Sequence, residues 1–417
     1  MGCDAVVALG RAAVNGQTVF GHNSFRSAQN TPHLCRTRGR AYAVGETVHT
    51  QFLEIGRARQ TYTVLASHPE GCWGYDHGLN EHELAIAGIP LRPTLPCEWP
   101  GLIGADLVRL GLEQSKTAHQ AVNLLTRLIE NHGQGSGGCE GIVDADSAFI
   151  VADPIEAYIL ETAGRYWVCQ EIHELRAQSE VRVVRQDWDH ISRGLADVAM
   201  NRGWWSCDGS KIDFAGIMGE LSAAEKAALR QWSRATLLLQ EQNGSIDLGF
   251  IRRIIGGEPR EDSHDEPPQA RGNTIVASFA ANLSSDPAHA PMAWCALGSG
   301  STGLFFPVFL EGELPNLLCG SRLASTAGFQ WRTDSANATT TPHKPSWTAA
   351  RDNLVRLQTR IDQETDEFLL EYAVIKGKGY TADVERQTSL FMEHHAEQVE
   401  EALCEAVSAT AAPLSVD

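Results

Sequence analysis

Two groups of strand-like segments, separated by a pair of helix-like segments, constrain the fold of this chain most. The segments rich in β-branched residues lie at 4–9, 18–22, 51–55, 61–66 and 84–89 before the helices, and at 147–151, 156–162 and 166–170 after them. Between the groups, residues 101–114 and 117–129 carry apolar side chains at helical spacing, and Thr117 is suited to cap the second helix. Strands that cluster, rather than alternate with helices, favour a layered α+β protein over a series of βαβ units.

The remainder of the chain is predicted to be mostly helical. Residues 187–255 have helical patterns, and 274–281 is a clear strand-like segment. Farther on, 347–375 and 382–407 carry apolar residues at intervals of three and four, as an amphipathic helix requires. The predicted organisation is one domain over 1–333, a Ser/Thr/Pro-rich linker over 334–346 and a C-terminal helical arm over 347–417. We expect any homo-oligomer to form through this arm.

Charge and composition exclude several classes of partner. The chain of 417 residues has 34 Lys and Arg against 52 Asp and Glu, a formal net charge of −18. Such an acidic chain is unsuited to nucleic acid or to an anionic membrane surface, because both are bound largely through Lys and Arg. No apolar run approaches the roughly 20 residues of a membrane helix, and the first residues lack the pattern of a signal peptide. We therefore expect a soluble, cytoplasmic protein.

Neither a disulfide framework nor a metal site is predicted. The ten cysteines are scattered and include no CxxC pair, and a chain of this length needs no covalent staples. The His394-His395 pair and the acidic run at 261–266 are expected to face solvent rather than to bind a metal ion.

Cys3 is the exception among the cysteines. It stands at the beginning of a strand-like segment that a hairpin follows. If Met1 and Gly2 were removed by autoprocessing or by a peptidase, Cys3 would carry both a thiol and a free α-amine. An α-amine, with a reference pKa of about 8, can take the proton of the adjacent thiol without a separate histidine.

Several sequence blocks accompany Cys3 in a fixed order. They are Cys3-Asp4, 20–26 (FGHNSFR), 73–82 (WGYDHGLNEH), 102–110 (LIGADLVRL), 132–135 (HGQG), 161–165 (ETAGR), 203–205 (GWW) and 213–215 (DFA). In this combination the chain resembles the secernins and the related dipeptidases, which are cysteine-type Ntn (N-terminal nucleophile) hydrolases. Within that family it most resembles the secernin-like subgroup, and the resemblance runs from Cys3 into the C-terminal arm.

The resemblance implies an αββα sandwich, in which two stacked antiparallel sheets lie between helical layers. It also implies hydrolysis of an amide bond in a small peptide or an N-acyl amide, without a cofactor. The Cys3 thiolate would attack the carbonyl carbon, hydrogen-bond donors would hold the oxyanion, and the α-amine would protonate the leaving amine.

The block around His22 departs from the family pattern. Relatives carry Lys or Arg where this chain has His22, and Asp where it has Phe25. His22 remains a candidate catalytic residue, either as a cation when protonated or as a base, and its alternative role is that of a hydrogen-bonded histidine at a strand end. Phe25 can neither orient the amine nor carry charge. The Asn that the acylase relatives carry has no clear match, and Gln178 and Ser179 are the nearest polar residues.

Five further residues are candidates for the site. Asn80 is a candidate catalytic donor to an oxyanion, although an Asn after a glycine turn more often stabilises that turn. Trp73 would wall a substrate pocket or anchor the core. Arg26 and Arg271 would hold a substrate carboxylate through paired hydrogen bonds, or else be solvated. Asn23 is the remaining candidate for substrate binding.

Two functional hypotheses remain open. The first is an Ntn-type cysteine amidohydrolase, a dipeptidase or N-acyl-amide hydrolase, with Cys3 as the nucleophile. The second is a secernin-like protein that keeps the fold and serves as a binding or regulatory partner without hydrolysis. His22 and Phe25 favour the second hypothesis, or an altered chemistry such as acyl transfer, and the ordered blocks favour the first. Removal of Gly2 distinguishes the two hypotheses, because a retained Gly2 keeps the nitrogen of Cys3 in an amide, which cannot act as a base.

Overall fold

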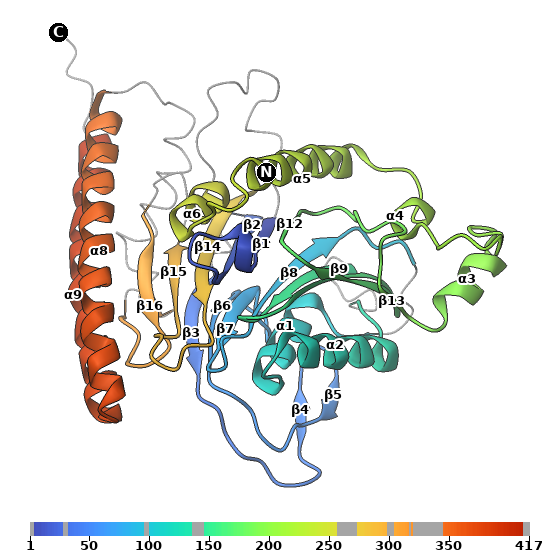
Figure 1. Cartoon of the computed structure of the whole chain (residues 1–417), viewed down its shortest axis with the longest axis horizontal. Coiled ribbons are helices and arrows are strands. Elements are labelled where there is room, and N and C mark those ends of the chain that lie inside the picture. Colours follow the sequence, from blue (N-terminus) through green and yellow to red (C-terminus); the bar gives the residue numbers. More distant parts are fainter. Residues whose placement is uncertain are drawn as a thin grey trace.

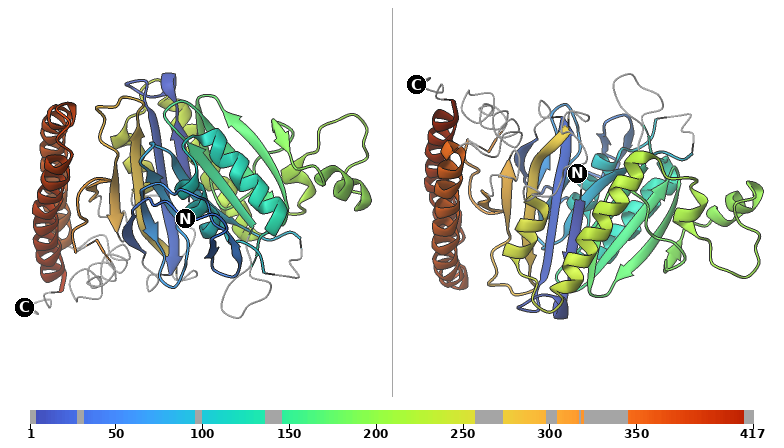
Figure 2. Two further views of the ribbon diagram at one scale, coloured as in Figure 1. Left: turned by 90° about the horizontal axis from the view of Figure 1, so that it is seen from below. Right: turned by 90° about the horizontal axis from the view of Figure 1, so that it is seen from above.

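The chain folds as two antiparallel sheets stacked face to face, with helices on both outer faces (Figures 1 and 2). The computed structural model describes residues 4–27, 32–95, 100–135, 146–256, 273–297, 304–316, 318–319 and 345–411. Every strand pairing among them is antiparallel apart from isolated bridges. The αββα layering expected from the sequence is therefore confirmed.

The first sheet has six strands and contains the N-terminal hairpin. In spatial order they are β12 (Leu175–Gln178), β1 (Asp4–Ala8), β2 (Thr18–Ser27), β14 (Asn273–Leu283), β15 (Met292–Leu297) and β16 (Phe306–Phe309). A short 3-10 turn (Gly10–Ala12) and Gly16, whose φ of +68° suits glycine, connect β1 to β2. Strand β1 thus lies inside the sheet, between β2 and β12.

The second sheet has eight strands and is built from the middle of the chain. Its order is β13 (His190–Ile191), β11 (Tyr166–Ile172), β10 (Ala157–Ala163), β9 (Asp146–Ala152), β8 (Ala85–Leu91), β7 (His77–Asn80), β6 (Val64–His68) and β3 (His33–Thr37). A separate hairpin joins β4 (Thr47–His49) to β5 (Glu54–Gly56). All seven residues of β9 are buried, as expected of a strand covered on both faces.

Helices cover the outer face of each sheet. On the eight-stranded sheet lie α1 (Gly104–Gln114) and α2 (Ala118–His132), and on the six-stranded sheet lie α5 (Ala223–Glu241) and α6 (Leu248–Gly256). The expected cap of α2 is present, because the Thr117 side chain accepts a hydrogen bond from the Gln120 amide. Helix α6 approaches β2 so closely that a Cβ on Gly21 would lie 2.4 Å from Ile251 Cγ2. Two shorter helices, α3 (Leu195–Asn201) and α4 (Phe214–Ile217), lie beyond the second sheet.

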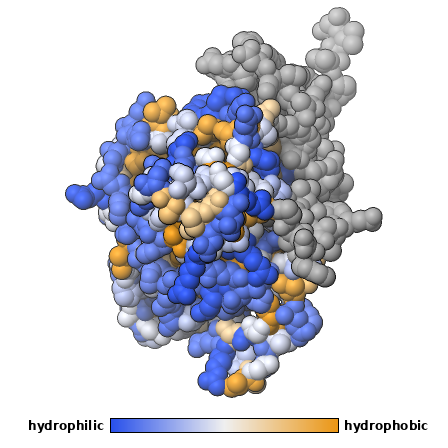
Figure 3. Space-filling model, turned by 90° about the vertical axis from the view of Figure 1, so that its right-hand side faces the viewer, coloured by the Kyte–Doolittle hydropathy of each residue, from blue (hydrophilic) through white to orange (hydrophobic). Residues whose placement is uncertain are grey.

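Two apolar cores hold these layers together. The larger core lies between the two sheets and continues beneath α5, α6 and the last two helices. The smaller core lies between the eight-stranded sheet and α1 and α2. The face turned away from the last two helices is mainly hydrophilic, with apolar residues in small separate patches (Figure 3).

The last two helices lie side by side against the edge of the six-stranded sheet (Figure 1). They are α8 (Pro345–Gly377) and α9 (Thr381–Ala411). Phe309 of β16 packs on Phe368 of α8 and Phe391 of α9. No helix of the described residues is both long enough and apolar enough to cross a membrane. The division into domain, linker and arm stays a prediction, because most of 334–346 lies outside the described residues.

Candidate active site

The first described residue of β1 is held by hydrogen bonds on two sides. Asp4 pairs with Asn23 of β2, and its backbone N–H donates to Asn23 Oδ1 at 3.0 Å. The other end of the same amide, Asn23 Nδ2, donates to the Ile255 carbonyl oxygen of α6 at 3.0 Å. Asn23 is only 2% exposed, so one buried side chain ties the start of β1 to the helix above it.

The Asp4 carboxylate is also buried and has two hydrogen-bond donors. The Ser179 hydroxyl donates to one of its oxygens, and the Gln231 amide of α5 donates to the other. Burial raises the pKa of Asp4 to about 7, and the two hydrogen bonds offset that rise only in part. Asp4 therefore titrates close to neutral pH.

Backbone and side-chain bonds fix the segment that carries Ser179. Glu161 of β10 accepts hydrogen bonds from the Val183 and Val184 amides at 2.8 and 3.2 Å. Arg182 donates to the Thr162 carbonyl oxygen and forms a buried ion pair with Asp146. These contacts hold Ser179, whose hydroxyl donates to Asp4, against the second sheet.

On the other face of β2, two buried histidines connect the sheets. His22 Nδ1 lies 2.7 Å from Nδ1 of His77, which belongs to β7 of the second sheet. One ring must carry its proton on Nδ1 and the other must accept it. Burial, and then the neighbouring ring, lowers the pKa of His22 well below its ordinary value, and burial lowers that of His77 to about 4. Both imidazoles are therefore neutral at neutral pH.

The polar row of β2 continues with Ser24 and Arg26. These alternate residues lie on the same face as His22, because side chains alternate along a strand. Ser24 Oγ lies 3.5 Å from His77 Nδ1. Arg26 pairs with Asp76, with Nε donating to Oδ2 at 3.0 Å. Burial would raise the pKa of Asp76, but Arg26 outweighs it and holds that pKa below its usual value.

The structure brings three of the sequence-predicted residues together on β2, beside the start of β1: His22, Asn23 and Arg26. Asn23 and His22 occupy opposite faces of β2 next to Asp4, and Arg26 extends the row. Cys3, which precedes Asp4 in the sequence, and Arg271 lie outside the described residues. Because His22 is buried and neutral, it cannot supply the fixed positive charge that relatives carry at this position.

For Asn80 and Trp73 the structure supports the second of the two roles that the sequence allowed. Asn80 was a candidate donor to an oxyanion, but its Nδ2 donates to the carbonyl oxygens of Leu112 and Ser115, each at 2.8 Å. Its Oδ1 accepts from the amides of His82 and Leu84, so the side chain closes the turn between β7 and β8 and ties it to the C-terminal end of α1. The structure supports the alternative that the sequence left open, a turn-stabilising asparagine.

Trp73 does not wall this site. It packs in the core beneath α1, where the Arg109 guanidinium lies 4.2 Å from its ring centre and donates to its carbonyl oxygen. That core is on the far side of the eight-stranded sheet from β2, so Trp73 belongs to the scaffold.

Sequence reasoning missed two residues of the site. His77 lies in the block at 73–82, and its place directly after Asp76, an acid next to a histidine, was the signal that could have singled it out. The sequence gives no such indication for Gln231, because a glutamine on a helix usually faces solvent. Gln178, named as a polar candidate, turns its amide to the carbonyl oxygens of Ser179 and Val181.

One group of side chains among the described residues could hold a metal ion, and it lies away from this site. Ligand atoms of Glu364, His394 and His395 lie within 4.8 Å of one another on α8 and α9. His394 is exposed as expected, but His395 is only 1% exposed because it packs on Phe391, so the expectation of a solvent-facing pair is wrong for His395. The acidic run at 261–266 lies outside the described residues.

The solved structures that resemble this chain are only distantly similar to it. No family model matches the chain. Among solved structures, a mutant of conjugated bile acid hydrolase from Clostridium perfringens is 12% identical, with a TM-score of 0.43 over 73% of this chain and 92% of that chain. Penicillin V acylase from Agrobacterium tumefaciens is 13% identical, with a TM-score of 0.41 over 74% and 86%.

A third similar structure is the Caenorhabditis elegans ortholog of N-acylethanolamine-hydrolyzing acid amidase. It is 11% identical, with a TM-score of 0.34 over 67% of this chain and 92% of that chain. At such identities and TM-scores the likenesses assign neither fold nor activity. The fold described above rests on the strand order and packing of this chain.

Proposed function

We propose that the protein is an Ntn-type cysteine amidohydrolase of the secernin-like kind, a dipeptidase or N-acyl-amide hydrolase. Cys3 is its nucleophile once the Gly2–Cys3 bond has been cleaved. The observation that supports this most is the anchoring of Asp4 by Asn23, Ser179 and Gln231. A fold that holds the beginning of its first strand this firmly is suited to present the preceding residue for chemistry.

The faces of the hairpin support the same proposal. Asp4 and Asn23 face α5 and α6, whereas His22 and Ser24 face the second sheet. The neutral imidazoles of His22 and His77, which face each other between the sheets, can exchange protons but add no positive charge.

In the proposed reaction the α-amine of Cys3 takes the thiol proton, and the thiolate attacks the carbonyl carbon of the amide. The carbon–nitrogen bond breaks as the resulting ammonium returns its proton to the leaving amine. Water then hydrolyses the thioester, releasing the carboxylic acid and regenerating the thiol. Asn23 and Asp4 act as positioning residues for the start of β1.

The substrate side of the proposal rests on the sequence alone. Arg271 is proposed to hold a substrate carboxylate, whereas Arg26 already pairs with Asp76. A cytoplasmic location and a homo-oligomer formed through the C-terminal arm likewise remain proposals.

The test begins with the intact mass and N-terminal peptide map of the purified protein. We expect a chain that begins at Cys3 and that turns over members of a panel of dipeptides and N-acyl amides. Cys3→Ala should lower turnover at least about 100-fold. Cys207→Ala is the matched control, because Cys207 is an exposed free thiol far along the chain and its loss should change nothing.

Two results would overturn the proposal. One is turnover that survives in Cys3→Ala. The other is a chain that retains Gly2 and hydrolyses no member of the panel, which would favour the non-hydrolytic binding protein.

A further inference from the structure

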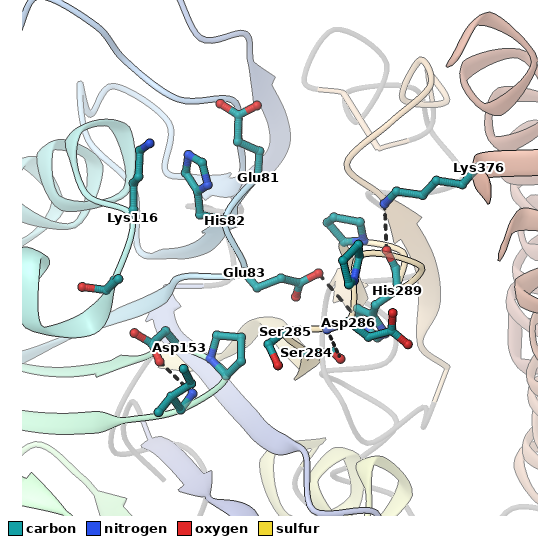
Figure 4. Close-up of a pocket in the computed structure, with 15 residues that line it drawn as sticks. Glu81, His82, Glu83, Lys116, Asp153, Ser284, Ser285, Asp286, His289 and Lys376 are labelled. Carbon is teal, nitrogen blue, oxygen red and sulfur yellow. Dashed lines mark hydrogen bonds and ion pairs between the residues drawn. The ribbon is translucent and has the colours of Figure 1, made fainter. Parts of the chain in front are cut away.

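A pocket of about 340 Å³ opens at the end of the sandwich opposite to Asp4 (Figure 4). Strand β1 runs from Asp4 to Ala8, about 13 Å at the rise of a strand. Near its far end the Thr18 hydroxyl donates to the carbonyl oxygen of Pro154, which lines the pocket. The walls come from the turn between β7 and β8, the loops before α2 and β10, the loop between β14 and β15, and the end of α8.

A buried carboxyl group that accepts no hydrogen bond of normal geometry lies in this pocket. Glu83 is only 7% exposed, and neither of its carboxylate oxygens accepts a hydrogen bond of normal geometry among the described residues. Its φ of +59° is unusual for a residue with a side chain. Since a buried carboxylate is costly unless donors reach it, this arrangement indicates a missing partner.

The neighbouring donors are engaged elsewhere. His289 Nε2 lies 3.9 Å from Glu83 Oε1, but it is 3.2 Å from the Asn282 carbonyl oxygen, to which it donates. Lys376 Nζ donates to the His289 carbonyl oxygen at 2.8 Å (Figure 4). It also donates to the Tyr372 hydroxyl at 3.0 Å. A ligand that carries a donor group would therefore complete the surroundings of Glu83.

The charge of the pocket favours a cation. The carboxylates of Glu81, Glu83, Asp153 and Asp286 line it, against the ammonium groups of Lys116 and Lys376. The two histidines in the lining add little positive charge, because burial lowers the pKa of both His82 and His289.

Part of the lining is apolar. Three prolines and an isoleucine contribute to it: Pro154, Ile155, Pro287 and Pro291. Ile155 is 82% exposed, so an apolar ligand would gain burial against it.

We propose that this pocket binds a small organic cation, a primary ammonium group on a compact apolar body. The ammonium group donates to Glu83, and the apolar body packs against the prolines and Ile155. The site is separate from the proposed nucleophile and does not depend on the proposed hydrolysis.

Binding should be linked to release of a proton. Burial raises the pKa of Glu83 to about 8, an effect that the nearby Ser284 amide and Lys376 offset only partly and that Glu311 increases. At pH 7 Glu83 is mostly protonated, whereas a bound ammonium favours the ionised form. Binding at pH 7 therefore releases close to one proton, and affinity rises as the pH increases from 6 to 8.

The experiment is isothermal titration of the full chain with three probes of similar size: benzylammonium, benzyl alcohol and benzoate. We expect benzylammonium to bind more tightly than the neutral and the anionic probe. Titration at pH 7 in two buffers of different ionisation enthalpy should report the released proton. The Cys3→Ala variant should bind benzylammonium as the wild type does, which separates this site from the proposed active site.

Two variants of the same turn complete the design. Glu83→Gln should weaken benzylammonium binding at least about tenfold and abolish proton release, because it removes the charge and keeps the shape. Glu81→Gln is the matched control. Glu81 is exposed, and its Oε1 accepts from the Thr63 amide as a glutamine oxygen also can, so we expect a change below about threefold.

Equal affinity for benzylammonium and benzyl alcohol, or tighter binding of benzoate, would overturn the proposal. A Glu83→Gln variant that binds benzylammonium as tightly as the wild type would also overturn it. If that variant did not fold, the comparison of the three probes on the wild type would decide, and benzyl alcohol that binds as tightly as benzylammonium would refute the proposal.

Discussion

Replacing Asn23 with alanine tests how the start of β1 is held. The change removes the acceptor of the Asp4 N–H and the donor to the Ile255 carbonyl oxygen, both at 3.0 Å. Asn23 is 2% exposed, so water cannot readily replace either bond. Each buried backbone group left unpaired costs about 1–3 kcal/mol, and we expect the free energy of unfolding to fall by about 4 kcal/mol.

Urea denaturation, followed by tryptophan fluorescence, measures this loss. With an m value of about 3 kcal/mol per molar urea, the midpoint should fall by a little over about 1 M. Ser278→Ala is the matched control, because Ser278 lies opposite Asn23 on β14, is 1% exposed and has a hydroxyl without a hydrogen-bond partner among the described residues. We expect that control to change the free energy of unfolding by less than about 0.5 kcal/mol.

The reasoning would be refuted if Asn23→Ala and Ser278→Ala gave the same midpoint. That outcome would mean that the two bonds of Asn23 contribute nothing beyond the packing of a small side chain. An unchanged m value is part of the expected result, since the surface exposed on unfolding should not change.

Three further predictions concern stability. Asp4 has a pKa of about 7 in the folded protein, against 3.8 for the ordinary group in the unfolded chain. The protonated group therefore stabilises the fold at low pH, and this part of the free energy of unfolding is lost as the pH rises from 4 to 7. That loss is at most about 4 kcal/mol, and Asp4→Asn should flatten this part of the profile of urea midpoint against pH. In thermal melts, Gly74→Ala should lower the free energy of unfolding by about 3 kcal/mol, because its Cβ would lie 2.1 Å from a backbone carbon of α1. Gly56→Ala is the control: it has open space around it and should leave the melting temperature unchanged. Arg182→Met should cost about 3–5 kcal/mol by removing the buried cation that pairs with Asp146, whose carboxylate keeps the Gly164 and Thr94 amides as donors. Adding Asp146→Asn, which removes the charge and keeps an acceptor, should restore part of that loss in a double-mutant cycle.

Local signals in the sequence were sufficient for many of the elements. The cap at Thr117 and the helical spacing after it predicted α2, because capping and periodicity depend on residues within a few positions of one another. The hairpin of β1 and β2 and the strand at 274–281 were recognisable for the same reason. Short strands such as β12, with four residues, were missed because so few residues show no clear alternation.

The site was only partly predictable. The resemblance drew attention to His22 and Asn23, and both lie beside the start of β1. For Asn80 and Trp73 the sequence left two roles open. An Asn after a glycine turn has the same appearance in sequence whether it stabilises the turn or faces a substrate. The same holds for a tryptophan that packs on the core or walls a pocket.

The sequence by itself determined the acidic charge, the main helices, several of the strands and the layered class of fold, because these depend on composition and on short-range periodicity. Only the tertiary structure decided that β14 lies beside β2, that His22 meets His77, and that Gln231 reaches Asp4 across 227 residues of chain. It likewise placed Glu83 in a pocket where neither of its carboxylate oxygens accepts a hydrogen bond of normal geometry from the described residues. Contacts of this kind form when whole apolar faces are buried against each other, and no local pattern specifies which face meets which.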